Sequence, residues 1–114
     1  MGARERGEGG QGGDSRAAAP LSEATLAILD AVDAVPHGRA VSYSEIARVA
    51  GVAPRQVGHV LARFGHEVPW HRVVMASGKP ARHLATEQLA RLREEGVPLV
   101  ADGSGVDLGA ARPS

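Results

Sequence analysis

Two short segments with helical periodicity lie next to each other between residues 43 and 64, and only three residues separate them. Ser42 or Ser44 is a suitable N-cap for the first segment, which Gly51 ends. Pro54 suits the first turn of the second segment, where its missing N–H is not needed. This spacing predicts a helix-turn-helix. The apolar side chains expected to face inward are those of Ile46, Val49, Val57, Val60, Leu61 and Phe64.

Further helices and extended pieces flank this pair. A helix is predicted from about Ser22 to the turn at residues 36–38, and a last helix from about residue 84 to 95. Residues 40–42 and 73–74 are expected to form short extended pieces. The predicted fold is therefore mainly α with a small β element, built as a winged-helix-like helix-turn-helix domain.

The two ends of the chain differ in composition from its centre. Residues 1–19 are Gly-rich and charged, so we expect a disordered tail that cannot bury enough surface to offset its ordering entropy. Residues 101–114 contain only Val106 and Leu108 as larger apolar residues and are expected to form a flexible C-terminal tail. One folded domain over residues 20–100 remains, and 114 residues leave no room for a second.

The chain contains no cysteine, which excludes disulfides, Cys-ligated zinc and thiolate nucleophiles. No apolar run is long enough for a transmembrane helix. The N-terminus also lacks the apolar stretch of a secretory signal. We therefore expect a soluble cytoplasmic protein with no membrane partner.

Charge is balanced over the whole chain, with 13 Lys and Arg against 13 Asp and Glu, but not along it. Residues 39–82 contain seven Lys or Arg, two Glu and all three aromatic side chains, Tyr43, Phe64 and Trp70. A basic stretch that coincides with a helix-turn-helix favours a polyanionic partner; the alternative is a solvated surface. Tyr43 is either a phosphate contact or a packing residue. Trp70, in a polar loop beside a proline, either stacks on a base or covers the domain.

Four motifs together resemble one family. They are residues 36–43 (PHGRAVSY), Ile46-Ala47 with Gly51, residues 55–58 (RQVG) and residues 68–74 (VPWHRVV). In this order they are similar to the DNA-binding domain of the O6-alkylguanine-DNA alkyltransferases, over about residues 21–97. That family carries a cysteine that accepts the alkyl group, and Trp70 holds its position here. The same replacement characterises the alkyltransferase-like proteins.

The resemblance implies a function without catalysis. Alkyltransferase-like proteins bind O6-alkylguanine in duplex DNA by base flipping, leave the lesion unrepaired and mark it for nucleotide excision repair. The implied partners are lesion-containing duplex DNA and nucleotide excision repair proteins. We expect a monomer that is nucleoid-associated when bound to DNA. No cofactor or metal is expected.

The resemblance also implies site residues. Arg55 would fill the space that the flipped base leaves, Tyr43 would contact a phosphate and Gly58 would let the helix backbone approach the DNA. His71 is expected to have a structural or hydrogen-bonding role, and Arg72 to form an intramolecular ion pair. The DNA contacts are expected at Tyr43, Arg55, Gly58, Arg39 and Lys79. The lesion pocket is expected to comprise Tyr43, Val68, Pro69, Trp70, His71, Arg72 and Ser77.

Other function classes stay open. A helix-turn-helix regulator without lesion specificity explains the basic stretch but not the loop around Trp70. A protein-interaction module predicts weak salt dependence of any DNA binding. A hydrolase built on Ser44 or Ser77 with His71 would lack both a G-x-S-x-G run and an orienting acid.

Overall fold

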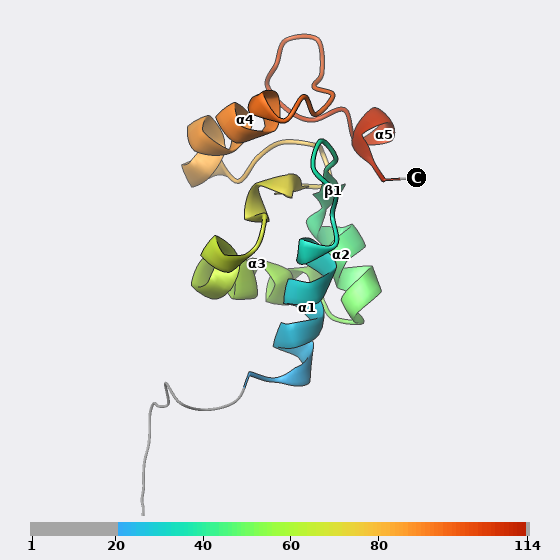
Figure 1. Ribbon diagram of the computed structural model, residues 1–114, viewed down its shortest axis with the longest axis vertical. Coiled ribbons are helices and arrows are strands. Elements are labelled where there is room, and N and C mark those ends of the chain that lie inside the picture. The colour runs from blue at the N-terminus through green and yellow to red at the C-terminus, as the bar shows by residue number, and fades with distance from the viewer. Residues whose placement is uncertain (1–20, 114) are drawn as a thin grey trace, which may run out of the picture.

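The computed structural model describes residues 21–113, in which helices predominate and a short pair of strands joins two helical layers (Figure 1). The predicted disordered tail at residues 1–19 lies outside the described residues. The first helix, α1, spans Glu23–Asp33 and begins at the expected cap, where the Ser22 hydroxyl accepts a hydrogen bond from the Thr25 N–H at 3.0 Å. Its buried face is formed by Ile28 and Val32.

The helix-turn-helix consists of α2 (Tyr43–Ala50) and α3 (Pro54–Phe64). Ser42 and Glu45 form a reciprocal capping box, in which the Glu45 N–H donates to the Ser42 hydroxyl and the Ser42 N–H donates to the Glu45 carboxylate. Gly51 ends α2 at a φ of 74°, a left-handed conformation that glycine adopts without strain. The prediction of two helices around this turn is confirmed.

Two of the predicted inward-facing residues are placed differently. Val49 is 75% exposed, because Ile46, Ala47 and Ala50 form the face of α2 that packs inward and Val49 is turned about 100° from the centre of that face. Phe64 is only half-buried at the end of α3, with the Arg63 guanidinium 5.5 Å from its ring centroid.

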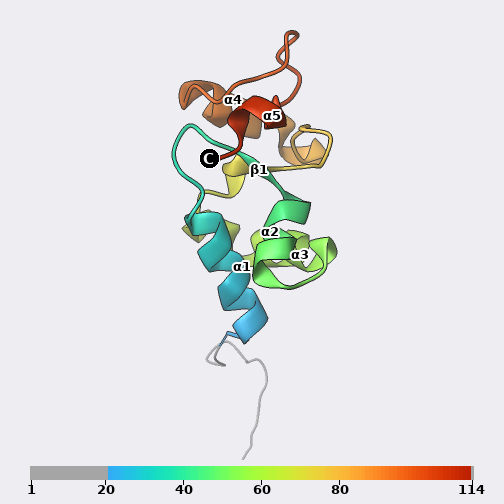
Figure 2. The same cartoon turned by 90° about the vertical axis from the view of Figure 1, so that its right-hand side faces the viewer.

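The two strands, β1 (Val41–Ser42) and β2 (Val73–Val74), pair in parallel, with Val41 opposite Val73. They lie between the α1–α3 layer and the layer that contains α4 and α5, as both views show (Figures 1 and 2). Because side chains alternate along a strand, Val73 belongs to the core with α1–α3, and Val74 belongs to the core with α4. The strand pair therefore connects two small hydrophobic cores and confirms the predicted α-rich fold with a minor β element.

The second layer is fixed by α4 (Ala85–Glu94) and its buried side chain Gln88. Gln88 is 1% exposed, donates to the carbonyls of His71 and Val73 at 3.1 and 2.7 Å, and accepts from the Ala81 N–H at 3.1 Å. One amide thus satisfies three buried backbone groups. Three short 3-10 helices, Gly65–Glu67, Trp70–Arg72 and Arg82–Leu84, complete the connections around it.

Residues 101–113 are packed against the domain, contrary to the flexible tail that the sequence predicts. Leu99 and Val106 form an antiparallel bridge, and the short helix α5 (Leu108–Ala111) follows. Val106 is 2% and Ala111 0% exposed. The Ala40 N–H donates to the Ala111 carbonyl at 3.1 Å, which joins α5 to the segment before β1. A few small apolar side chains suffice here, because they fill the second core rather than form one of their own.

Gly78→Ala should weaken this C-terminal packing. A Cβ at Gly78 would lie 2.2 Å from the Val106 carbonyl oxygen, and the φ of Gly78 is +88°. We expect unfolding by urea to show a loss of about 1–3 kcal/mol. Gly51→Ala is the matched control, since Gly51 also has a positive φ but no atom within 4 Å of the added Cβ. Equal losses in the two variants would show that the contact with Val106 does not stabilise the fold.

Candidate nucleic-acid interface

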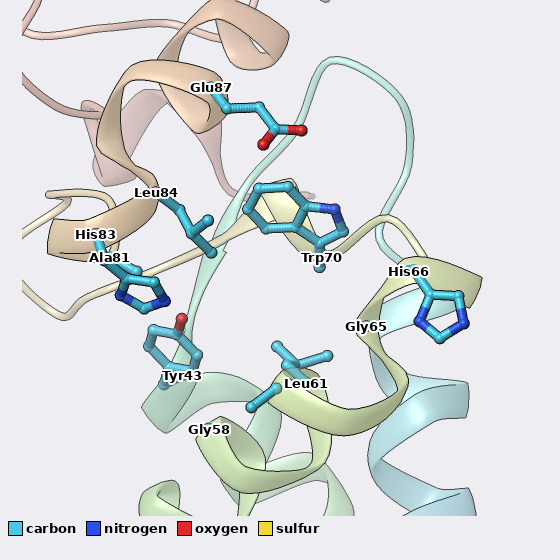
Figure 3. A pocket seen from close by; sticks show the side chains of 11 residues that line it. Tyr43, Gly58, Leu61, Gly65, His66, Trp70, Ala81, His83, Leu84 and Glu87 are labelled. Carbon is cyan, nitrogen blue, oxygen red and sulfur yellow. The ribbon is translucent and has the colours of Figure 1, made fainter.

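An open cavity of about 480 Å³ lies between α3, the loop that carries Trp70, and the start of α4 (Figure 3). Its small and aliphatic lining residues are Gly58, Leu61, Ala62, Gly65, Ala81 and Leu84. Its polar or aromatic lining residues are Tyr43, His66, Trp70, His83 and Glu87. We call this cavity the α3–α4 pocket. An apolar cavity with a few polar groups at its rim is the usual form of a small-ligand site.

Trp70 forms one wall of the α3–α4 pocket. The residue begins the 3-10 helix Trp70–Arg72 and is half-buried. Gly65 favours close packing of its backbone against Trp70, because a Cβ at Gly65 would lie 3.3 Å from the Trp70 Cβ. The Arg91 guanidinium lies 5.8 Å from the indole centroid and adds a cation–π contact on the side of α4. Gly65 thus packs against the base of the Trp70 side chain, and Arg91 lies over its ring.

Tyr43 faces Trp70 across the pocket from the first turn of α2, with its hydroxyl directed into the pocket (Figure 3). Burial raises the pKa of Tyr43 above its ordinary value of 10.0. The hydroxyl therefore keeps its proton at neutral pH and can donate a hydrogen bond to an anionic oxygen.

The Trp70 loop is supported by a buried ion-pair cluster centred on Glu95. The Glu95 carboxylate lies 2.6 Å from His71 Nε2 and 2.9 Å from Arg72 Nη2, and it accepts the Gly38 N–H at 3.1 Å. Arg72 also donates to the Val35 carbonyl at 2.9 Å. The structure thus shows the structural role expected for His71 and the intramolecular ion pair expected for Arg72.

Burial of the Glu95 carboxyl by itself raises its pKa, but the hydrogen bonds from Arg72, His71 and Gly38 outweigh that effect and hold the pKa at about 2. Glu95 therefore remains ionised at neutral pH. It is a residue that the sequence analysis does not predict for the site. Its partners lie more than twenty residues away in the chain, so no local sequence pattern indicates the cluster.

The predicted site residues separate into two groups. Tyr43, Gly58 and Trp70 line the α3–α4 pocket together. The others are not among its lining residues: Val68 packs against the first core, Pro69 precedes the Trp70 turn, and Ser77 lies exposed in the turn before Gly78.

The remaining predicted contacts are exposed cations. Arg39 donates to the Ala110 carbonyl at 3.3 Å, and Lys79 lies in the turn after Ser77. Arg55 is exposed in the first turn of α3. Within residues 21–113 no ion pair involves Arg55, so its guanidinium is available to an external partner.

Residues 23–97 match the family described as 6-O-methylguanine DNA methyltransferase, DNA binding domain. The chain belongs to this family. Alkyltransferase-like protein 1 of Schizosaccharomyces pombe is 36% identical over 87 residues, which span 69% of this chain and 81% of that protein. The DNA base-flipping protein of Thermus thermophilus is 44% identical over 61 residues, which span 52% of this chain and 42% of that protein.

The fold agrees with that of a family member bound to DNA. The crystal structure of S. pombe Atl1 in complex with damaged DNA containing O6-carboxymethylguanine matches this chain with a TM-score of 0.71 and 31% sequence identity. The match covers 84% of this chain and 99% of the other. The prediction of a helix-turn-helix domain of the alkyltransferase type is therefore confirmed.

Alkyl transfer in this family needs an acceptor thiol. The chain has no cysteine, and Trp70 holds the acceptor's place in the Pro-x-His-Arg-Val motif, so this motif offers no thiol to accept an alkyl group. Within residues 21–113, no three His, Asp or Glu side chains are placed to hold a metal ion. No helix of this part of the chain is both long and apolar enough to cross a membrane.

Proposed function

We propose that this protein is a non-enzymatic sensor that binds O6-alkylguanine in duplex DNA by base flipping and marks it for nucleotide excision repair. The observation that carries the proposal is the position of Trp70, which holds the acceptor's place in the sequence motif and lines the α3–α4 pocket beside α3. The Trp70 indole has no thiol to accept an alkyl group, but its ring can contact one.

The geometry suits an extruded base. An enzyme or sensor that inspects O6 of guanine closely must take the base out of the stack, which costs a few kcal/mol and least where pairing is already damaged. The cavity of about 480 Å³ lies in the size range of small-ligand sites. The exposed Arg55 on α3 would occupy the vacated space, and the protonated Tyr43 hydroxyl would bind the adjacent phosphate.

Lesion preference is the property that tests this proposal. We would titrate the protein with two short duplexes that differ only in one O6-methylguanine, at one stated salt concentration, using the fluorescence of Trp70. The expected result is tighter binding of the lesion duplex, with the methyl group still on the DNA afterwards. Equal binding of both duplexes would instead indicate a general helix-turn-helix DNA-binding protein.

The link to repair needs a separate measurement. The complex would be recognised by nucleotide excision repair proteins, and the sensor would act as a monomer in the cytoplasm, associated with the nucleoid when bound. In a reconstituted excision assay, adding the protein should increase incision of an O6-methylguanine duplex and leave an undamaged duplex uncut. Unchanged incision would separate lesion binding from repair signalling.

Gly58→Ala should separate stability from DNA binding. An added Cβ at Gly58 meets no protein atom within 4 Å, so helix packing does not require this glycine. The variant should be more stable by about 0.5–1 kcal/mol, since alanine favours a helix interior. It should nevertheless bind the lesion duplex more weakly, because the added methyl group would hinder the close approach of the DNA backbone to α3. Unchanged affinity would leave Gly58 without a role in DNA approach.

Trp70→Ala should reduce lesion preference more than general DNA affinity. The variant removes the apolar wall that would contact the alkyl group, whereas the exposed cations that bind phosphates remain. Buried apolar area contributes about 25 cal/mol per Å², so the loss on a single methyl contact is about 1 kcal/mol, or roughly fivefold. A parallel loss of affinity for undamaged duplex, or of helical circular dichroism, would show that Trp70 mainly stabilises the fold.

A further inference from the structure

Glu87 is the one Asp, Glu, Lys or Arg among the described residues that line the α3–α4 pocket. It lies in the first turns of α4, and its carboxylate is placed next to the indole of Trp70 (Figure 3). The rest of the lining is apolar, aromatic, hydroxyl or imidazole. Glu87 is therefore the one carboxylate that a substituent bound in this pocket would meet among the described lining residues.

Glu87 is paired with Arg91, one helical turn further on. The Glu87 Oε2 atom accepts from Arg91 Nε at 3.2 Å and lies 3.1 Å from Arg91 Nη2. The Arg91 guanidinium lies over the Trp70 ring and lines a neighbouring cavity of about 280 Å³, not the α3–α4 pocket. Glu87 therefore lines the pocket, whereas Arg91 lies over the Trp70 ring and outside the pocket lining.

We propose that Glu87 makes this site select neutral or cationic O6 substituents and disfavour anionic ones. This inference rests on the proposed function, because it assumes that the substituent on guanine O6 enters the α3–α4 pocket beside Trp70. A substituent carboxylate would then lie close to the Glu87 carboxylate at the wall of an open pocket, where like charges repel. A hydroxyl or methyl substituent meets no such repulsion, and a hydroxyl can donate to Glu87.

A preference against anionic substituents would not be a general property of the fold. The similar S. pombe Atl1 structure is a complex with DNA that contains O6-carboxymethylguanine, so the same fold accommodates an anionic substituent there. A side chain at the pocket wall is a sufficient means to change that preference, because it acts on the substituent and leaves the phosphate contacts unchanged.

The test compares a neutral and an anionic substituent of similar size. Wild-type protein would be titrated with four otherwise identical duplexes that contain guanine, O6-methylguanine, O6-(2-hydroxyethyl)guanine or O6-carboxymethylguanine. The titrations are made at pH 8, where an ordinary imidazole is neutral. We expect the hydroxyethyl duplex to bind about tenfold more tightly than the carboxymethyl duplex.

Two variants identify the residue responsible. Glu87→Gln keeps the shape of the side chain and removes its charge, and should bring the hydroxyethyl and carboxymethyl affinities to within about twofold. Glu94→Gln is the matched control, because it makes the same charge change on α4 at a residue that does not line the pocket. It should leave the ratio at the wild-type value. Thermal unfolding checks that both variants fold, which we expect since the Glu87–Arg91 pair is about half exposed.

The possible failures are distinguishable. If wild-type protein does not prefer O6-methylguanine to guanine, the proposed function fails and this inference fails with it. If it prefers O6-methylguanine but binds the carboxymethyl and hydroxyethyl duplexes equally, only the inference fails. An unchanged ratio in Glu87→Gln, or an equal change in Glu94→Gln, would assign the selectivity to another group or to the overall charge.

Discussion

Arg55→Ala should lower the affinity for an O6-methylguanine duplex by about ten- to a hundredfold, which corresponds to about 1–3 kcal/mol. Arg55 lies exposed in the first turn of α3 and makes no ion pair within residues 21–113. Its removal therefore leaves the fold intact and changes only what the helix presents to DNA. A guanidinium that fills the vacated stack and pairs with the orphaned base acts only when a base is flipped, so the preference for the lesion should fall as well.

The control for Arg55→Ala is Arg48→Ala, which removes the same charge from the last turn of α2. Arg48 is also exposed. Loss of a phosphate contact weakens the binding of all duplexes alike. It also makes the slope of log affinity against log salt concentration shallower by about one. Arg48→Ala should therefore leave the ratio of lesion to undamaged affinity unchanged. If Arg55→Ala also leaves that ratio unchanged, Arg55 is a phosphate contact and does not intercalate.

Glu95→Ala should destabilise the protein by about 3 kcal/mol, because it leaves the partly buried Arg72 guanidinium without its anionic partner. The side chains of Glu95, His71 and Arg72 are all at most 15% exposed, so water would replace the lost carboxylate only in part. Urea unfolding measures the difference directly. Glu94→Ala, at the exposed neighbouring residue, should change stability by less than about 0.5 kcal/mol. Equal effects of the two substitutions would show that the Glu95 cluster does not stabilise the domain.

The same cluster predicts an acid-sensitive fold. The pKa of Glu95 is about 2 in the folded protein, against an ordinary value of 4.5. A lowered folded-state pKa adds stability above the ordinary value, and this stability is lost as the pH falls from about 4.5 to about 2. The stability difference between wild type and Glu95→Gln should therefore shrink over that pH range. A difference that is constant between pH 6 and pH 3 would contradict the low pKa.

The local helices could be predicted from the sequence because their signals lie within a few residues of each other. Ser22 caps α1, Ser42 caps α2, and Gly51 and Pro54 mark the turn between α2 and α3, all as the pattern indicates. The inward face of α2 was less predictable. The position of Val49 on the helix is compatible with several apolar faces, and the packing of α1 and α3 selects the one that leaves it exposed.

The site was predictable only in part. The motif around Trp70 and the absence of cysteine could be recognised directly, and Tyr43 and Gly58 do meet Trp70 at the pocket. The sequence also placed Ser77 there, although it lies in an exposed turn. Glu87 was missed, because its place at the pocket wall depends on how α4 packs against the Trp70 loop through Gln88.

The sequence by itself determined the helix-turn-helix, the family and the loss of the acceptor thiol, since each is written in short stretches of adjacent residues. Only the tertiary structure decided the Glu95 cluster and the packing of residues 101–113. The Glu95 carboxylate binds residues from two distant segments, Gly38 in one and His71 with Arg72 in the other. Val106 and Ala111 are buried only because the second core has room for small side chains. In both cases the stabilising contact joins residues far apart in the chain. Such a contact cannot be predicted from the composition of one segment.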